Sequence, residues 1–185
     1  MSVSRTIMVD SRNYATADFK DVEVTGEQIV GTIADAEQLL QKAFTVGQGI
    51  LAAEMLGAAS QVFDLTAAYL RERKQFGRII GEFQALQHRA AHLYCELENA
   101  RSAVLSALRA LDNNDEKVEI FAAMAKAKLG SVAKLSALEA VQLHGGMGMT
   151  DELDIGLYLK RIRVLQELFG DGDYHADRLA TLREN

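Results

Sequence analysis

The sequence of 185 residues contains no proline, no tryptophan and only one cysteine. Because proline interrupts helices, its absence permits long uninterrupted ones. The single cysteine, Cys95, excludes an intrachain disulfide and is typical of a reducing compartment; it falls within an apolar helical pattern, so we expect it in the core. The sequence also lacks an apolar run long enough to span a membrane, and its first residues do not form a signal-peptide pattern.

An excess of positive charge is lacking as well, since the formal net charge is −6 and the isoelectric point is near 5.3. Nucleic-acid binding normally needs a basic face, so this function class is excluded. The apolar content of 49% and the charged content of 25% are those of an ordinary globular protein. We therefore expect a cytoplasmic, mostly α-helical protein with no membrane span and no nucleic-acid partner.

The first 32 residues differ from the rest. Val22 and Val24 alternate with acidic residues, and Ile7 and Val9 are compatible with a second short strand. Two or three short strands do not form a stable sheet by themselves. We interpret residues 1–32 as the remnant of a larger β region, or as strands that pair with another chain, and residues 33–185 as a helical domain.

Apolar residues recur every three or four positions in four later segments. This spacing predicts helices over about 35–73, 83–111, 118–144 and 150–168, followed by a short final helix from about Tyr174. Thr150, Asp151 and Glu152 offer acceptors for the first N–H groups of the fourth helix. Short polar turns between long helices predict an all-α fold, an up-down four-helix bundle.

A basic segment, residues 71–77, stands at the expected end of the first helix. Cations there complement the helix dipole and Gly77 can end the helix, which is one interpretation. The other is an anion site in which Arg73 binds a phosphate or pyrophosphate through two hydrogen bonds.

A glycine-rich run, residues 142–149, follows the third helix. Its three glycines within four positions exceed what a helix end needs. Glycine lets a backbone approach a ligand closely and offer its N–H groups. The run therefore favours a binding turn, and a plain connection between helices is the alternative.

Metal-ligand patterns are weak. His88 and His92 have the spacing of two ligands on one helix, but the glutamate that a zinc protease needs after the first histidine is missing. Asp171, Asp173 and His175 lack the other ligands of a calcium loop. We predict no metal site, and a metal-binding bundle through the histidine pair is the least favoured alternative.

Two of these segments, taken together, resemble the C-terminal helical domain of the acyl-CoA dehydrogenase family. Residues 69–84, YLRERKQFGRIIGEFQ, and residues 142–149, QLHGGMGM, are similar to its two helical signatures, in the same order. Residues 14–24 resemble the last strands of its middle β-domain. The resemblance implies a flavoprotein oxidoreductase that acts on the CH–CH bond of acyl-CoA thioesters. It also implies that the N-terminal domain and most of the β-domain lie outside this sequence.

The resemblance also implies FAD and an oligomer. Family members are dimers of dimers with each FAD between subunits, so we expect a homo- or hetero-oligomer, a dimer or a tetramer. Arg73 and Gln75 would contact the pyrophosphate of a cofactor held mainly by a neighbouring subunit. The cofactor-binding residues carried over from the family are Arg73, Gln75, Phe76, Ile80, Gln84, Gln142 and Gly146.

The catalytic base of the family has no counterpart. Most members use a glutamate at the position of Phe169, and others use one near the position of Gly47; neither residue here can accept a proton. The resemblance therefore implies a chain that is inactive alone and works beside a partner with the glutamate. The alternative from another class is a structural or assembly bundle that binds no cofactor by itself.

Overall fold

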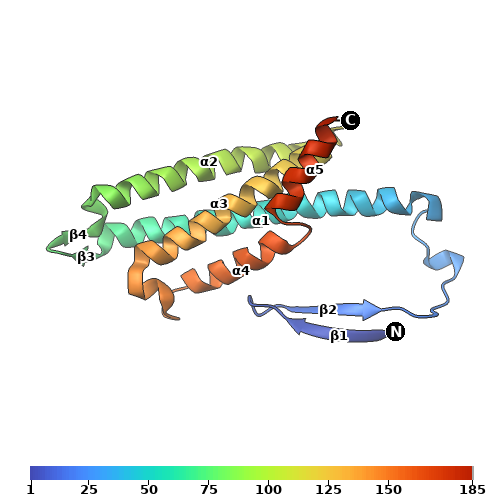
Figure 1. The fold of residues 1–185 in the computed structure, drawn as a ribbon, viewed down its shortest axis with the longest axis horizontal. Coiled ribbons are helices and arrows are strands. Elements are labelled where there is room, and N and C mark those ends of the chain that lie inside the picture. Colours follow the sequence, from blue (N-terminus) through green and yellow to red (C-terminus); the bar gives the residue numbers. More distant parts are fainter. Residues whose placement is uncertain (185) are drawn as a thin grey trace.

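The computed structural model describes residues 1–184 and shows a bundle of antiparallel helices (Figure 1). None of its helices combines the length and the apolar character that crossing a bilayer requires. Three are long and two are short: α1 (Ala36–Glu72), α2 (Gln84–Asp112), α3 (Val118–His144), α4 (Ile155–Glu167) and α5 (Gly172–Glu184). The predicted all-α bundle with a short final helix is confirmed.

The expected start of the fourth helix is wrong. The glycine-rich run continues beyond α3 as a short 3₁₀ segment, η4 (Gly145–Met149), and α4 begins only at Ile155. The Thr150 hydroxyl donates a hydrogen bond to the Met147 carbonyl at 2.8 Å instead of accepting one from α4. Thr150 therefore closes the glycine turn rather than capping the next helix.

Helix α3 occupies the centre of the bundle and packs against α1, α2, α4 and α5. Small side chains let it approach α1 closely: the Ser136 hydroxyl donates to the Ala59 carbonyl at 2.8 Å, and both residues are fully buried. The larger core residues then fill the space between the helices; they are Met55, Leu93, Leu97, Val104, Leu129, Val132, Ile162 and Leu165.

The N-terminal strands differ from those expected. The structure has a two-stranded antiparallel sheet, β1 (Ser2–Ile7) and β2 (Asn13–Asp18), whose outermost pair is Ser2 and Asp18. Val22 and Val24 are not in a strand, because β2 ends at Asp18, where β1 begins and offers no further partner; beyond that point Asp21 has a φ of +49°. Val9 lies in the turn between the two strands.

A single arginine ties this sheet to the helices. Arg161 of α4 donates to the Asp10 carboxylate, in the β1–β2 turn, and to the Glu54 carboxylate of α1, at 2.8 and 2.7 Å. Burial raises the pKa of Asp10, but the hydrogen bonds from Arg161 and from the Arg12 N–H, together with the attraction of both guanidinium groups, outweigh it and leave that pKa below its ordinary value. The sheet is thereby held on the α4 side of the bundle (Figure 1).

The expectation that Cys95 is a core residue is also wrong, because its side chain is exposed. The buried stripe of α2 runs through Leu93 and Leu97. A residue two positions after Leu93 is rotated by about 200° around the helix axis, so Cys95 faces outward.

A core substitution tests this packing. Leu129 and Leu138 both lie on α3, but Leu129 is fully buried and Leu138 is 49% exposed. We expect Leu129→Ala to lower the free energy of unfolding by about 2–5 kcal/mol, and Leu138→Ala to change it by less than about 0.5 kcal/mol. Urea unfolding measures both variants. Equal losses would contradict the position of α3 in the core.

Candidate cofactor-binding site

A short hairpin connects α1 to α2. Its strands are β3 (Lys74–Gln75) and β4 (Arg78–Ile79), and Gln75 pairs with Arg78 across the turn. The two turn residues, Phe76 and Gly77, have φ values of +54° and +79°, as in tight two-residue hairpins. A left-handed conformation costs a residue with a Cβ about 1–2 kcal/mol. Phe76 is nevertheless held in it, and the residue is 88% exposed.

The base of the hairpin is anchored in the core. The Ile80 side chain is only 6% exposed and packs with Leu70 of α1 and Leu143 of α3. Its N–H donates to the Arg73 carbonyl at 2.8 Å. Gly81 lies so close to α1 that an added Cβ would be 2.7 Å from the Leu70 carbonyl oxygen. Ile80 thus faces this chain's own core, whereas the hairpin beyond it projects outward.

The glycine-rich turn after α3 has a tight side and an open side. A Cβ on Gly148 would come within 2.6 Å of the Val141 carbonyl oxygen, so this glycine is needed for packing. A Cβ on Gly146 would meet nothing within 4 Å, and Gly146 is exposed. Because no packing within the chain requires glycine at position 146, the open side leaves room for a ligand to approach the backbone.

The expected cofactor residues gather at one end of the bundle. The hairpin and the glycine-rich turn both lie there (Figure 1). They are joined by the Leu70–Ile80–Leu143 cluster and by the stacked rings of Tyr69 and His144, whose centroids are 4.3 Å apart. Ile80 is the buried one; the exposed members of the set are Arg73, Gln75, Phe76, Gln84, Gln142 and Gly146.

The two positions expected for a base meet in the turn between α4 and α5. A Cβ on Gly47 of α1 would be 2.5 Å from a ring carbon of Phe169, so the phenyl ring occupies the space of a side chain at position 47. The centroid of the Phe169 ring lies 5.5 Å from the centroid of the Phe44 ring. Phe169 itself has a φ of +58°. Phe44, Phe169 and Gly47 therefore meet where the base is expected, and none of their side chains can ionise.

Two buried side chains hold the Phe169 turn in place. Lys126 of α3 donates to the carbonyls of Gln166 and Gly170 at 2.9 and 2.8 Å, and His175 of α5 donates through Nε2 to the Phe169 carbonyl at 3.0 Å. Burial lowers the pKa of Lys126 to about 8, and burial also lowers the pKa of His175. The apolar repeat of α3 places position 126 inside, so a lysine there is the signal that sequence reasoning missed.

The other candidate groups do not form a reactive centre. His88 and His92 are both exposed, and within residues 1–184 no group of three or more His, Cys, Asp or Glu side chains could hold a metal ion. The Asp171 carboxylate accepts a hydrogen bond from the Tyr174 N–H at 2.9 Å and so caps α5.

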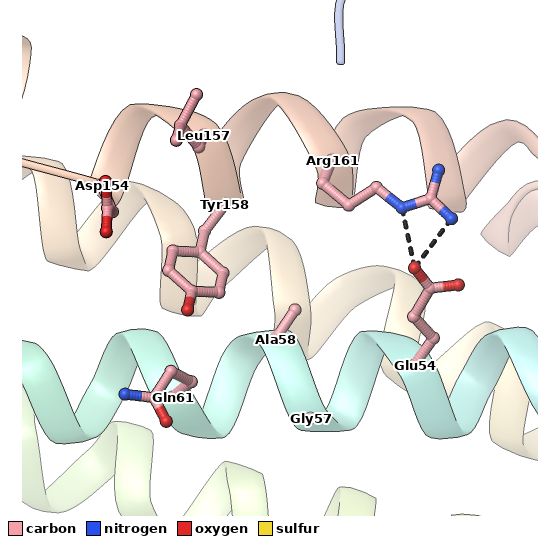
Figure 2. Close-up of a pocket in the computed structure, with 8 residues that line it drawn as sticks. All are labelled: Glu54, Gly57, Ala58, Gln61, Asp154, Leu157, Tyr158 and Arg161. Atoms are coloured by element: carbon pink, nitrogen blue, oxygen red, sulfur yellow. Dashed lines mark hydrogen bonds and ion pairs between the residues drawn. The ribbon is translucent and has the colours of Figure 1, made fainter. Parts of the chain in front are cut away.

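A groove of about 450 Å³ between α1 and α4 is lined by Glu54, Gln61, Tyr158 and Arg161, among others. Figure 2 shows Glu54 turned toward Arg161, which holds its carboxylate through two hydrogen bonds. Glu54 is thus engaged in the link to α4. The groove contains none of the expected cofactor residues.

The comparisons with known proteins agree with this architecture. A family model described as the C-terminal domain of acyl-CoA dehydrogenase matches residues 38–181. The chain belongs to the acyl-CoA dehydrogenase family. The matched range of this acyl-CoA dehydrogenase domain runs from the start of α1 into α5 and includes both the hairpin and the Phe169 turn.

Relatives cover the domain at moderate identity. The acyl-CoA dehydrogenase IpdE2 of Mycolicibacterium smegmatis is 42% identical over 121 residues, 65% of this chain and 37% of that protein. The mitochondrial short/branched chain specific acyl-CoA dehydrogenase of Bos taurus is 33% identical over 146 residues, 79% of this chain and 34% of that protein. This acyl-CoA dehydrogenase chain therefore spans less than half the length of either relative.

The fold is shared with a solved enzyme. The structure of butyryl-CoA dehydrogenase from Megasphaera elsdenii superimposes with a TM-score of 0.93 at 22% identity, covering 100% of this chain and 49% of that one. The superposition shows that the acyl-CoA dehydrogenase domain and its N-terminal strands share an arrangement with about half of that enzyme's chain.

Lys126 gives the domain a pH-dependent stability. Its pKa falls from 10.5 to about 8 on folding, so the unfolded chain binds more protons between these values and the free energy of unfolding rises with pH there. Relative to Lys126→Met, we expect the wild type to gain on the order of 3 kcal/mol between pH 8 and 10.5. Urea unfolding at several pH values measures this gain.

The matched control is Lys128→Met, which removes a lysine on the same helix whose side chain is 34% exposed and paired with Glu96. That variant should keep the wild-type rise with pH. The quantity to follow is the free energy of unfolding of the wild type minus that of Lys126→Met. A value that stays constant or falls as the pH rises would contradict the buried position of Lys126.

Proposed function

We propose that this chain is the C-terminal domain of an acyl-CoA dehydrogenase-like flavoprotein that binds FAD and supplies no catalytic base. The reaction class is oxidation of the CH–CH bond of an acyl-CoA thioester. The observation that carries the proposal is the hairpin: it projects a guanidinium, an amide and an exposed aromatic ring from a rigid core anchor. Such groups suit the phosphates and the apolar rings of a dinucleotide.

The residues present fit FAD. Arg73 and Gln75 are exposed and supply donors for a pyrophosphate, and Gly146 leaves its backbone open to close approach. Bound FAD would supply the acceptor for the hydride that leaves the β-carbon of the acyl group. The role of this chain is to bind and orient the cofactor through the hairpin and the glycine-rich turn.

The distance along α1 supports an oligomer. The helix rises about 1.5 Å per residue, so its stretch from Gly47 to Glu72 is roughly 40 Å long. A flavin dinucleotide is much shorter than that, so one cofactor cannot serve both the hairpin and the Phe169 turn of the same chain. The hairpin therefore serves a cofactor whose flavin lies at another subunit, in a homo- or hetero-oligomer.

An apolar surface on α1 is available for such contacts. Monomers rarely expose large contiguous apolar patches, which instead mark contact surfaces. The large apolar side chains exposed on the first four turns of α1 are Leu39, Leu40, Phe44, Val46 and Ile50. The same surface would also serve the alternative function, a structural bundle that assembles through α1 and binds no cofactor by itself.

No carboxylate of the Phe169 turn is placed as a base. Phe169 and Gly47 cannot accept the α-proton of an acyl group. Close to them, Glu167 forms an ion pair with Arg163 at 2.6 Å, and the Asp171 carboxylate caps α5. We therefore propose that the chain works beside a partner subunit whose carboxylate removes the proton.

Flavin binding distinguishes the two functions. The protein in its oligomeric form should take up FAD with a shift of the flavin absorption bands. Arg73→Met should weaken FAD binding at least about tenfold, because one charge-assisted hydrogen bond contributes about 1.5–3 kcal/mol. The control is Arg71→Met, which removes the same charge from the last turn of α1. An unchanged flavin spectrum would favour the assembly module, whereas equal effects of the two substitutions would contradict the specific role of Arg73.

A further inference from the structure

The hairpin region carries unpaired positive charge in an acidic protein. Residues 71–78 contain four cations and one carboxylate, a net charge of +3, whereas the whole chain has −6. The described part of the chain contains no ion pair with Arg71, Arg73, Lys74 or Arg78. The helix dipole accounts for Arg71 in the last turn of α1, but not for the three cations beyond the helix.

Arg78 differs from the other cations in being held in place. Its guanidinium carbon lies 4.1 Å from the centroid of the Phe83 ring, a cation–π contact. The Phe83 ring in turn packs against the Leu70–Ile80–Leu143 cluster and meets Phe76 edge to face, with their centroids 6.1 Å apart. The aromatic ring covers one face of the guanidinium and leaves its N–H edge free to donate.

Strand register places Arg78 beside the expected pyrophosphate ligands. Gln75 and Arg78 are directly paired across the hairpin, so their side chains share one face. Arg73 precedes Gln75 by two positions and therefore belongs to that face, because successive side chains of an extended chain alternate. Lys74 pairs with Ile79 and belongs to the opposite face.

We propose that Arg78 is a further cofactor-binding residue, a second guanidinium that binds the pyrophosphate of the dinucleotide next to Arg73. Phe83 positions it. The pyrophosphate carries two charged phosphates, and two guanidinium groups on one face can each bind one of them. Lys74, on the other face, contributes only long-range attraction. This inference rests on the proposed function, because it concerns the same cofactor.

The test is the affinity of the oligomeric protein for FAD, followed by flavin fluorescence. Arg78→Met should weaken binding about tenfold, through loss of one charge-assisted contact. Lys74→Met removes the same charge from the opposite face and should weaken binding less than about twofold, since screening reduces attraction between separated exposed charges. Arg78→Lys keeps the charge without the planar stacking group and should fall between the two.

A second probe locates the contact. ADP contains the pyrophosphate but no flavin, and Arg78→Met should weaken its binding by a similar factor. Equal effects of Arg78→Met and Lys74→Met on FAD, or an unchanged affinity for ADP, would overturn the role of Arg78. Circular dichroism melting checks that each variant is folded.

The outcomes separate this inference from the proposed function. If the wild-type oligomer takes up no FAD, the proposed function fails and the role of Arg78 fails with it. If Arg73→Met weakens FAD binding and Arg78→Met does not, the domain binds FAD without Arg78, and this inference alone fails.

Discussion

The close contact between α1 and α3 is the constraint on which the rest of the structure depends. Ser136 and Ala59 are fully buried where the two helices are joined by a side chain-to-carbonyl hydrogen bond. Toward one end, the pair carries the Leu70–Ile80–Leu143 cluster that supports the hairpin. Toward the other end, Lys126 of α3 donates a hydrogen bond to the Gly170 carbonyl in the Phe169 turn, and Gly47 of α1 leaves the space that the Phe169 ring fills. A shift of one helix along the other would displace both regions.

The Phe169 turn and Gly47 are complementary in shape. The ring of Phe169 lies where a side chain at position 47 would project, so substitution at either position affects the space available at the other. Lys126 and His175 bind the carbonyls on this turn and keep the ring there. Phe169 thus takes part in packing with Phe44, which explains how this position is filled by an apolar side chain.

Periodic and local patterns in the sequence predicted most of the helices. The repeats of three and four placed α1, α2 and α3 within about two residues, because each helix buries a continuous stripe and no proline interrupts it. The glycines near Gly146 were recognisable because they exceed what a helix end requires. The cations near Arg73 also suit an ordinary helix end, so only the resemblance of the whole segment singled them out. The superposed enzyme fold and the matching family model confirm this architecture.

Features set by tertiary contacts were not predictable. The start of α4 depends on how the glycine turn closes on itself through Thr150, and the strands depend on the pairing of β1 with β2, which ends at Ser2 and Asp18. Lys126 is buried because two carbonyls from other segments accept its hydrogen bonds. The cation–π contact of Arg78 with Phe83 likewise requires the hairpin to fold back, which no local pattern encodes.

The central claim is that this domain helps to bind a flavin but supplies no base. The most direct measurement is deuterium exchange at the α-carbon of an acyl-CoA, with the FAD-loaded homo-oligomer in deuterated buffer. Because neither Phe169 nor Gly47 can accept a proton, the account predicts no incorporation above that of buffer alone. Deuterium entering the α-carbon in the homo-oligomer, without a partner subunit, would contradict it.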